Sequence, residues 1–525
     1  MALVQTWQSP ISPFRWARLC GALAIRALLC SLVALGGAAE VWAINFASIR
    51  QAVYKINVVA QEPRVSQPWL HHSSTESSGT GFYIGNERIL TNAHVVAHAK
   101  FITVTRDGSD KAEIARVKFI AHDCDLAILE LKNLSSFDDI EALRFSGLPQ
   151  LRRPVATIGY PLGGEQISIT EGVVSRIAYR QYAHTSYHSH ILVQVDSAIN
   201  PGNSGGPVIQ GGQVVGVAFQ SFNNAENTGY IIPQPVISRF LLDIEDGTYD
   251  GHPEDGIVTM DGVMDNPATR FFHGLKAGDH GVKVSYVERY GAAYRRILPG
   301  DILVGIAGQA IGNDGKINFQ GERLDYKLLF DLAQIGDVVD FRVIREGRLL
   351  IVPVKAQPSK PHYLPYSTFG RHPRFLVYSG LVFTALSLDY LRGWGRSWFR
   401  DAPILLRYLH EYSGMEPRFQ DVRDIVVLAS RLPDEINAYA QNYEEKVLTR
   451  VNGTEIRSLE DLDRATTQDH SPFVVLEFQK DDAPIVLYRA EATKAHARTV
   501  ERYGVSPQKW LGDERDDGAT AGTDL

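Results

Sequence analysis

Cysteine is nearly absent from this chain of 525 residues, which contains only Cys20, Cys30 and Cys124. Three cysteines cannot build a disulfide scaffold, so the fold must be stabilised by apolar cores. A surplus of basic residues is absent as well, because 53 Lys and Arg stand against 60 Asp and Glu, a net charge of −7. Since nucleic-acid binding needs a basic face, we expect no nucleic acid among the partners.

Acidic residues are missing from the first part of the chain, where none precedes Glu40. Three arginines come before a short apolar run at 27–38, and small residues follow it. This order predicts a signal peptide over residues 1–43, cleaved near Ala43, and export to a periplasm. An acid-poor leader that contains arginine is also typical of an organelle transit peptide, so an organelle lumen is the alternative location.

Apolar runs of membrane-spanning length are not found after the leader. The stretch Phe375–Leu388 is too short to cross a bilayer and contains Gly380 and Ser387. We interpret it as buried strand and expect no stable membrane span in the mature chain.

Short apolar runs alternate with Gly, Asn and Ser between residues 44 and 246. This pattern predicts many short strands in an antiparallel barrel or sandwich. Two longer polar stretches interrupt it, at 61–78 and 179–190. We expect both to be surface loops, and loops of this length inside a compact domain are usually functional.

Two smaller units follow the first one. The unit at 253–356 contains strands, turns and a terminal hairpin, and a proline-bearing linker at 357–373 comes after it. The unit at 374–490 repeats this outline and includes a short helix that Ser458 begins with capping-box spacing. Residues 491–525 are predicted to be a C-terminal tail. Tandem modules of one kind are more typical of binding than of catalysis.

The motif with the clearest chemistry is Asn200-Pro-Gly-Asn-Ser-Gly-Gly-Pro207. Glycines around Ser204 allow a tight turn that exposes the hydroxyl and lets backbone N–H groups converge, as an oxyanion hole requires. His94, at the end of an apolar strand, can supply the base. Asp123 and Asp125 are both candidates for the orienting carboxylate, and periodicity does not choose between them. Taken alone, each motif could be an ordinary structural feature, such as a loop or a strand end, without a catalytic role. The order His, Asp, Ser along the chain favours a chymotrypsin-type triad.

These three motifs resemble those of the HtrA/Deg serine proteases, and Gly229–Pro233 is similar to the segment that closes the specificity loop of that family. The resemblance covers about residues 45–490. It implies a mainly β fold, with a chymotrypsin-like double β-barrel at 44–246 followed by two small α+β PDZ-like domains. The second of them, at 374–490, resembles the divergent PDZ domain of the plant-type Deg branch.

The resemblance also implies a role for each motif residue. Ser204 would be the nucleophile and His94 the general base, and Asp125 would orient the base, because Leu-Ala follows it directly as in the family. The backbone N–H groups of Gly202, Asn203 and Ser204 would bind the oxyanion. The substrate strand would lie beside Val217, Ala218, Phe219 and Gln220.

No P-loop motif for nucleotide phosphates occurs, so we expect no cofactor and no ATP dependence. His184, His188 and His190 lie close together but show no recognised ligand spacing, so we expect no metal. The resemblance implies unfolded polypeptide substrates, a homotrimer or larger homo-oligomer, and peptide C-termini as partners of the PDZ-like domains. The resulting hypothesis is an ATP-independent serine endopeptidase for unfolded exported proteins. The alternative is a chaperone or PDZ-type adaptor in which the protease unit is a scaffold.

Overall fold

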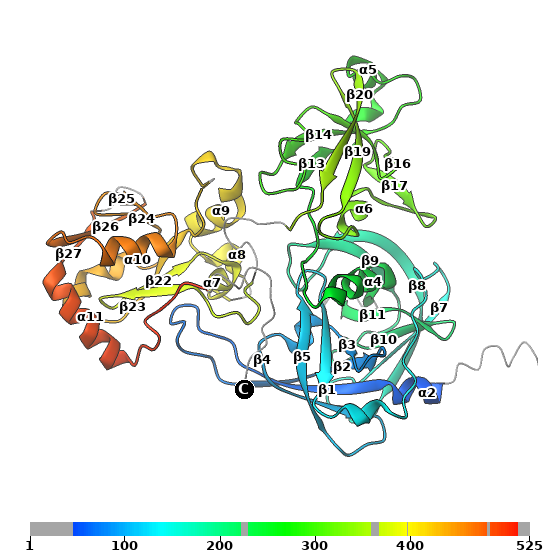
Figure 1. Cartoon of the computed structure of the whole chain (residues 1–525), viewed down its shortest axis with the longest axis horizontal. Helices are drawn as coiled ribbons and strands as arrows, with labels where there is room; N and C mark the ends of the chain where they lie inside the picture. The colour runs from blue at the N-terminus through cyan, green and yellow to red at the C-terminus, as the bar shows by residue number, and fades with distance from the viewer. Residues whose placement is uncertain are drawn as a thin grey trace, which may run out of the picture. The chain divides into compact units, whose positions relative to one another are not determined.

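The computed structural model describes residues 46–221, 229–358, 367–395, 397–419, 421–479 and 483–512 (Figure 1). The predicted signal peptide at 1–43 lies outside the described residues. A short helix, α2 (Phe46–Gln51), precedes the first strand. Among the helices in the described ranges, none is long and apolar enough to cross a membrane.

Two closed β-barrels of six strands each follow α2. Their strands are β1 (Val53–Ala60), β2 (Thr75–Tyr83), β3 (Ile89–Thr91), β4 (Ala99–Arg106), β5 (Glu113–Ala121), β6 (Leu126–Leu131), β7 (Pro154–Gly159), β8 (Ser168–Gln181), β9 (Ser189–Val195), β10 (Pro207–Gln210), β11 (Gln213–Ser221) and β12 (Gly229–Pro233). The first barrel has the order β1-β2-β3-β6-β5-β4 and the second β10-β11-β12-β9-β8-β7, with antiparallel pairing (Figure 1). The predicted chymotrypsin-like double barrel is therefore confirmed.

The barrels are stabilised by side chains that alternate along each strand. On β1, Tyr54, Ile56 and Val58 point into the core of the first barrel and are at most 2% exposed. Burying one such aliphatic side chain contributes about 1.5–3 kcal/mol. Two helices complete this part: α3 (Ala93–Val96), directly after β3, and α4 (Gln234–Asp243), directly after β12.

The next region, which we call the middle region, has an α+β fold. Its elements are β13 (Ile257–Met260), α5 (Pro267–Phe272), β14 (Val282–Val287), β15 (Ile302–Ile306), β16 (Gln309–Ala310), β17 (Lys316–Phe319), β18 (Glu322–Asp325), α6 (Lys327–Asp331), β19 (Val338–Arg345) and β20 (Arg348–Lys355). The main sheet has the order β13-β14-β15-β19-β20, with β16 paired to β15, and β17 and β18 form a separate hairpin. Phe330 of α6 and Phe341 of β19 lie in its core.

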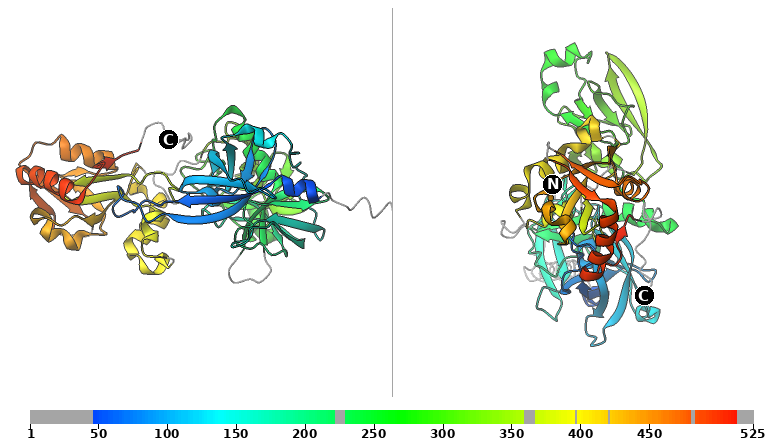
Figure 2. Two further views of the ribbon diagram at one scale, coloured as in Figure 1. Left: turned by 90° about the horizontal axis from the view of Figure 1, so that it is seen from below. Right: turned by 90° about the vertical axis from the view of Figure 1, so that its left-hand side faces the viewer.

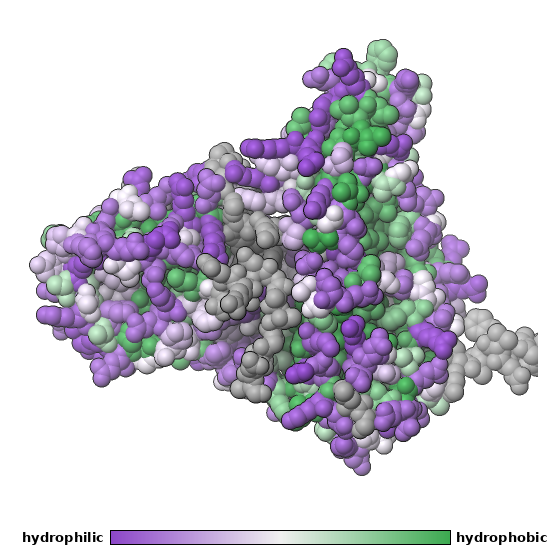
Figure 3. Space-filling model, viewed as in Figure 1, coloured by the Kyte–Doolittle hydropathy of each residue, from purple (hydrophilic) through white to green (hydrophobic). Residues whose placement is uncertain are grey.

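The C-terminal region is also α+β and contains two four-stranded sheets. Its elements are β21 (Phe375–Tyr378), β22 (Leu381–Ala385), α7 (Leu388–Arg392), α8 (Trp398–Asp401), α9 (Ile404–Tyr412), β23 (Val426–Arg431), β24 (Leu448–Val451), β25 (Thr454–Glu455), α10 (Leu459–Thr467), β26 (Phe473–Phe478), β27 (Ile485–Tyr488), α11 (Arg489–Tyr503) and β28 (Lys509–Trp510). The Ser458 side chain caps α10 by accepting the N–H of Asp461, as predicted. On the face drawn in Figure 3, hydrophilic side chains predominate over this region.

Residues 491–512 of the predicted C-terminal tail form a helix and a short strand. Helix α11 buries Ala492, Ala495 and Thr499 on one face, and β28 pairs with β21. In both views of Figure 2, α11 lies along the C-terminal region. This helix was not predicted because its buried face consists of small residues and lacks the large apolar side chains that usually mark an amphipathic helix. Charged and polar residues fill the rest of its surface.

The two stretches predicted to be surface loops lie mostly outside helix and strand, but strands extend into both of them and part of each is buried. In the first, β2 begins at Thr75, and Trp69 is buried against Phe375 with ring centroids 5.9 Å apart. In 179–190, β8 and β9 continue to the pair Gln181 and Ser189. The side chains of Tyr182 and His190 are buried. Polar side chains such as Tyr182 and His190 can be buried in these segments because they have hydrogen-bond partners inside the fold.

Candidate active site

His94 and Asp125 lie at the ends of two strands that pair with each other. His94 is in the helical turn after β3, and Asp125 directly precedes β6. Oδ2 of Asp125 is 2.6 Å from Nδ1 of His94, and Oδ1 accepts the backbone N–H of His94 at 2.7 Å. The Asp125 side chain is fully buried, whereas that of His94 is 33% exposed. A carboxylate at Nδ1 keeps the proton on that nitrogen and leaves Nε2 as the basic atom.

The structure separates the two aspartates between which periodicity could not choose. Residues 122–125 form a turn rather than strand, and Asp125 has a positive φ of 55°. The two side chains therefore diverge. Asp125 contacts His94, whereas Asp123 accepts hydrogen bonds from the Tyr249 hydroxyl at 2.6 Å and the His252 backbone N–H at 3.0 Å.

Burial alone would lower the pKa of His94. The charge of Asp125 and its hydrogen bond outweigh burial, so the pKa of His94 is raised above its usual value. A base must be unprotonated to accept a proton. The raised pKa therefore places the acid limb of any His94-dependent rate at a higher pH than an isolated imidazole would give.

Ser204 lies in a turn between β9 and β10 that only glycine allows at two positions. Gly202 and Gly205 have φ of 98° and 86°, and a Cβ at either would clash with backbone atoms, of Tyr160 and Thr80 respectively. The buried Thr80 hydroxyl donates to the Gly202 carbonyl at 2.7 Å. The Ser204 hydroxyl donates to the Phe219 carbonyl at 3.2 Å, which places it beside β11.

The structure changes part of the expected substrate edge. Val217 is paired on both sides, with Pro207 of β10 and Ile232 of β12, and Ala218 donates to Gly206 and accepts from Gly205. Both side chains are fully buried, so neither of them faces the surface on which a substrate would lie. Pairing with β10 ends at Val217, while Gln220 still pairs with β12. The edge of β11 beside Ser204 therefore begins at Phe219.

Two further histidines lie next to the His94–Asp125 pair. Nε2 of His184 is 3.9 Å from Oδ1 of Asp125 and 2.9 Å from Nδ1 of His122. Burial is the main cause that lowers the pKa of His184 to about 4, so this ring is neutral at physiological pH. Sequence analysis missed its proximity to Asp125, because a histidine in a polar stretch gives no sign of which strand end it will contact.

One group of side chains could in principle hold a metal ion. His190, His252 and Asp331 are buried, and their ligand atoms lie within 4.8 Å of one another. Structural zinc sites have four ligands, and these three side chains already bind one another through hydrogen bonds. Their arrangement is therefore explained without a metal.

Comparison with known proteins decides the family. The model of the trypsin-like peptidase domain matches residues 79–217, and the PDZ domain model matches residues 364–509. The mitochondrial Protease Do-like 4 of Arabidopsis thaliana is 33% identical over 462 residues, covering 86% of this chain and 84% of that protein. This chain belongs to the HtrA/Deg family of serine proteases. It is thus a serine endopeptidase, and the resemblance inferred from its motifs is confirmed.

A second Do-like protease agrees with this assignment. The chloroplastic Protease Do-like 2 of Arabidopsis thaliana is 34% identical over 472 residues, covering 89% of this chain and 76% of that protein. Among solved structures, the HtrA-type protease AlgW with tripeptide is 23% identical, with a TM-score of 0.47, and covers 60% of this chain and 96% of that one. The PDZ match extends to residue 509, which agrees with the ordered elements found beyond residue 490.

Proposed function

We propose that Ser204, His94 and Asp125 are the catalytic triad of this endopeptidase. The observation that carries the proposal is the 2.6 Å contact between His94 Nδ1 and the buried Asp125 carboxylate. His94 Nε2 takes the proton of the Ser204 hydroxyl as Oγ attacks the scissile carbonyl, and then gives it to the leaving amine. Asp125 stabilises the imidazolium that forms between these steps. Water repeats the sequence to release the acyl group from Ser204.

The backbone of the serine turn would stabilise the tetrahedral intermediate. We assign the oxyanion hole to the N–H groups of Gly202, Asn203 and Ser204. The N–H of Asn203 donates to the carbonyl of Asn200, so in the present state of the turn Gly202 and Ser204 are the better placed donors. Losing one such donor typically costs about 3–4 kcal/mol of barrier. A substrate strand would add to β11 from Phe219 onward, where the edge is not paired with β10.

We propose unfolded polypeptides as the substrates, cleaved without ATP. An edge strand recognises an extended main chain, and a folded protein does not present one. The test compares reduced, unfolded casein with a natively folded protein of similar size, each with and without ATP and Mg²⁺. We expect cleavage of casein alone, at a rate that ATP does not change. Cleavage of the folded protein at an equal rate, or stimulation by ATP, would contradict the proposal.

Membership of the family supports a proposal for the partners and for the oligomer. We propose a homotrimer or larger homo-oligomer and peptide C-termini as ligands of the PDZ domain. The middle region has a comparable α+β fold, and we propose it as the first PDZ-like domain. Its surface carries Phe271 and Phe272, which are 83% and 84% exposed, next to a hollow of about 520 Å³. Apolar side chains at such a hollow are compatible with peptide binding.

We propose an organelle as the location, rather than the periplasm that the leader first suggested. The names of the similar Do-like proteases carry mitochondrial or chloroplastic locations, and the acid-poor leader agrees with a transit peptide. Residues 1–60 fused to a fluorescent protein should enter an organelle in plant cells, whereas the same fusion with its arginines changed to glutamate should not. Secretion of the first fusion would contradict the proposal and restore the export hypothesis.

A further inference from the structure

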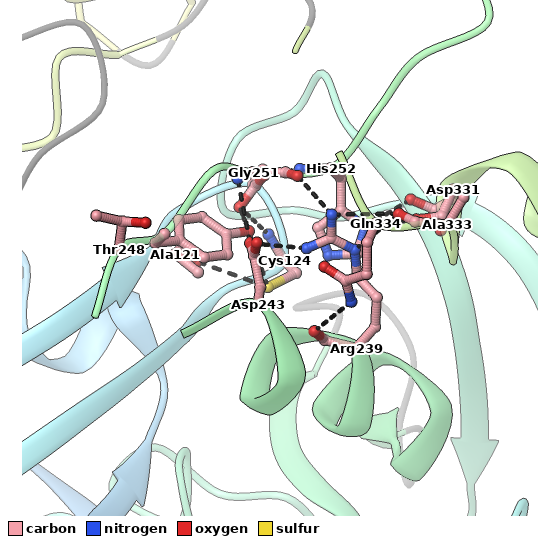
Figure 4. Close-up of polar contacts among 12 residues, drawn as sticks. Ala121, Cys124, Arg239, Asp243, Thr248, Gly251, His252, Asp331, Ala333 and Gln334 are labelled. Atoms are coloured by element: carbon pink, nitrogen blue, oxygen red, sulfur yellow. Dashed lines mark hydrogen bonds and ion pairs between the residues drawn. The ribbon is translucent and has the colours of Figure 1, made fainter. Parts of the chain in front are cut away.

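A group of buried side chains links the middle region to the turn that carries Asp125. His190 comes from β9, His252 from the segment after α4, and Asp331 is the last residue of α6. All three side chains are at most 5% exposed. Figure 4 shows Asp331 and His252 close together above the end of α4. The proposed triad uses none of these residues.

Both ring nitrogens of His190 face hydrogen-bond acceptors. Nδ1 is 2.9 Å from Oδ1 of Asp331, and Nε2 is 2.9 Å from the backbone oxygen of Asp123. A backbone oxygen can only accept, so Nε2 carries a proton. Burial would lower the pKa of His190, but the charge and hydrogen bond of Asp331 raise it above the usual value. Asp331 thus fixes the ring of His190 as Asp125 fixes the ring of His94.

The carboxylate of Asp331 is itself held on two sides. Burial would raise its pKa, but His190, followed by His252, holds the pKa well below the usual range, so Asp331 is ionised. The ring of His252 is neutral, because burial lowers its pKa, and its Nδ1 donates to Oδ1 of Asp331 at 2.7 Å.

The acceptor of the His190 proton belongs to the turn at 122–125. The Asp123 carbonyl accepts from His190, and the Asp123 carboxylate accepts from Tyr249 and from the His252 backbone. Two residues later, Asp125 has a φ of 55°, which costs a non-glycine residue about 1–2 kcal/mol. A backbone of this kind persists only where its surroundings hold it. The hydrogen bonds that Asp123 accepts therefore hold the backbone conformation that Asp125 needs.

The middle region is also fixed against α4, so Asp331 has a defined position. Arg239 pairs with Asp243 at 2.9 Å and donates to the carbonyls of Gly251 at 2.6 Å and Ala333 at 3.3 Å. The side chain of Gln334 donates back to the Arg239 carbonyl at 3.1 Å. Figure 4 shows these contacts converging on Arg239.

We propose that His190 is a positioning residue for the endopeptidase reaction. Its Nε2–H holds the Asp123 carbonyl and thereby the turn that presents Asp125 to His94, and the carboxylate of Asp331 in the middle region keeps the protonated ring in place. The inference rests on the proposed role of Asp125. It makes the orienting acid of the first barrel depend on a residue of the second barrel.

The test compares two variants of the full chain that carry the same charge. In Asp331→Asn, the amide can donate to Nδ1 of a neutral His190 and accept from His252, so the Nε2–H anchor persists and most of the turnover should remain. In His190→Phe/Asp331→Asn, the ring volume is kept but the anchor is gone. Because a misplacement of about 1 Å costs about 100-fold, we expect kcat on a fluorogenic peptide to fall about 10–100-fold with KM nearly unchanged.

The pH profile separates positioning from general loss of structure. If Asp125 contacts His94 less well, the pKa of His94 falls, and the acid limb of kcat/KM moves to lower pH in the double variant only. Asp340→Asn, an exposed carboxylate on β19, is the control and should change neither quantity. Thermal melting confirms that each variant is folded.

Three results would overturn the inference. They are equal turnover in the two variants, an unshifted acid limb in the double variant, or one zinc ion per chain bound by His190 in the purified protein. Asp125→Asn in the same assay keeps this failure distinct from failure of the triad. If Asp125→Asn is itself active, the proposed role of Asp125 is wrong. If Asp125→Asn is inactive and the two test variants are equally active, only the proposed role of His190 is contradicted.

Discussion

Ser204→Ala is expected to lower the turnover of unfolded casein by about 10⁶-fold, since the reaction has no other nucleophile in this turn and loss of a triad serine has an effect of this size. The glycines at 202 and 205 set the backbone, and alanine at 204 fits it, so the variant should fold and melt like the wild type. Casein cleavage and thermal melting measure the two quantities.

Its control is Ser285→Ala, at an exposed serine on β14 outside the proposed active site, which should retain activity. The hydroxyl of Ser204 donates to the Phe219 carbonyl, and removing it costs only that hydrogen bond in the resting enzyme. Undiminished proteolysis by Ser204→Ala would refute the triad. It would favour the alternative hypothesis of a binding protein with a protease scaffold.

Asp125→Asn is expected to lower turnover by about 10⁴-fold, because an amide at this position stabilises the wrong tautomer of the base. Oδ1 of Asp125 also accepts the backbone N–H of His94, and an amide oxygen can keep that contact, so the loss should be in kcat. The acid limb should move to lower pH, since the Asp125 charge is what raises the pKa of His94. Steady-state kinetics on either side of neutral pH measure both.

Asp123→Asn is the matched comparison, because this carboxylate is also buried and lies two residues away. An asparagine there keeps one oxygen, which can still accept from the His252 backbone N–H, while its NH2 group can donate to the Tyr249 hydroxyl. We therefore expect a much smaller loss than for Asp125→Asn. The opposite ranking would show that Asp123 is the orienting acid and that the geometry of the turn has been misassigned.

The sequence was sufficient to predict the residues that have local motifs. Ser204 has glycines that the turn requires, and His94 follows an apolar strand, so both could be proposed from the residues alone. Asp125 could be selected only through the family resemblance. The reason is physical: its positive φ turns the side chain away from Asp123, and no periodicity encodes a single residue of that conformation.

Contacts between distant segments could not be predicted in the same way. His190, His252 and Asp331 meet only because the middle region packs against the barrels, and each alone is an ordinary polar residue. Helix α11 was missed for a related reason, since its buried face consists of alanine and threonine. The sequence also does not show where the edge of β11 becomes free, because a β-bulge and the end of β10 determine that position.

The most direct measurement is the position of covalent labelling by a serine-directed phosphonate on the full-length wild-type protein. The nucleophile that His94 and Asp125 activate should react, and peptide mass spectrometry should find one adduct per chain, on Ser204. Pre-incubation with unfolded casein should slow the labelling, because substrate and phosphonate compete for the same oxygen. An adduct on another serine, or none on Ser204 in a protein that still cleaves casein, would contradict this account.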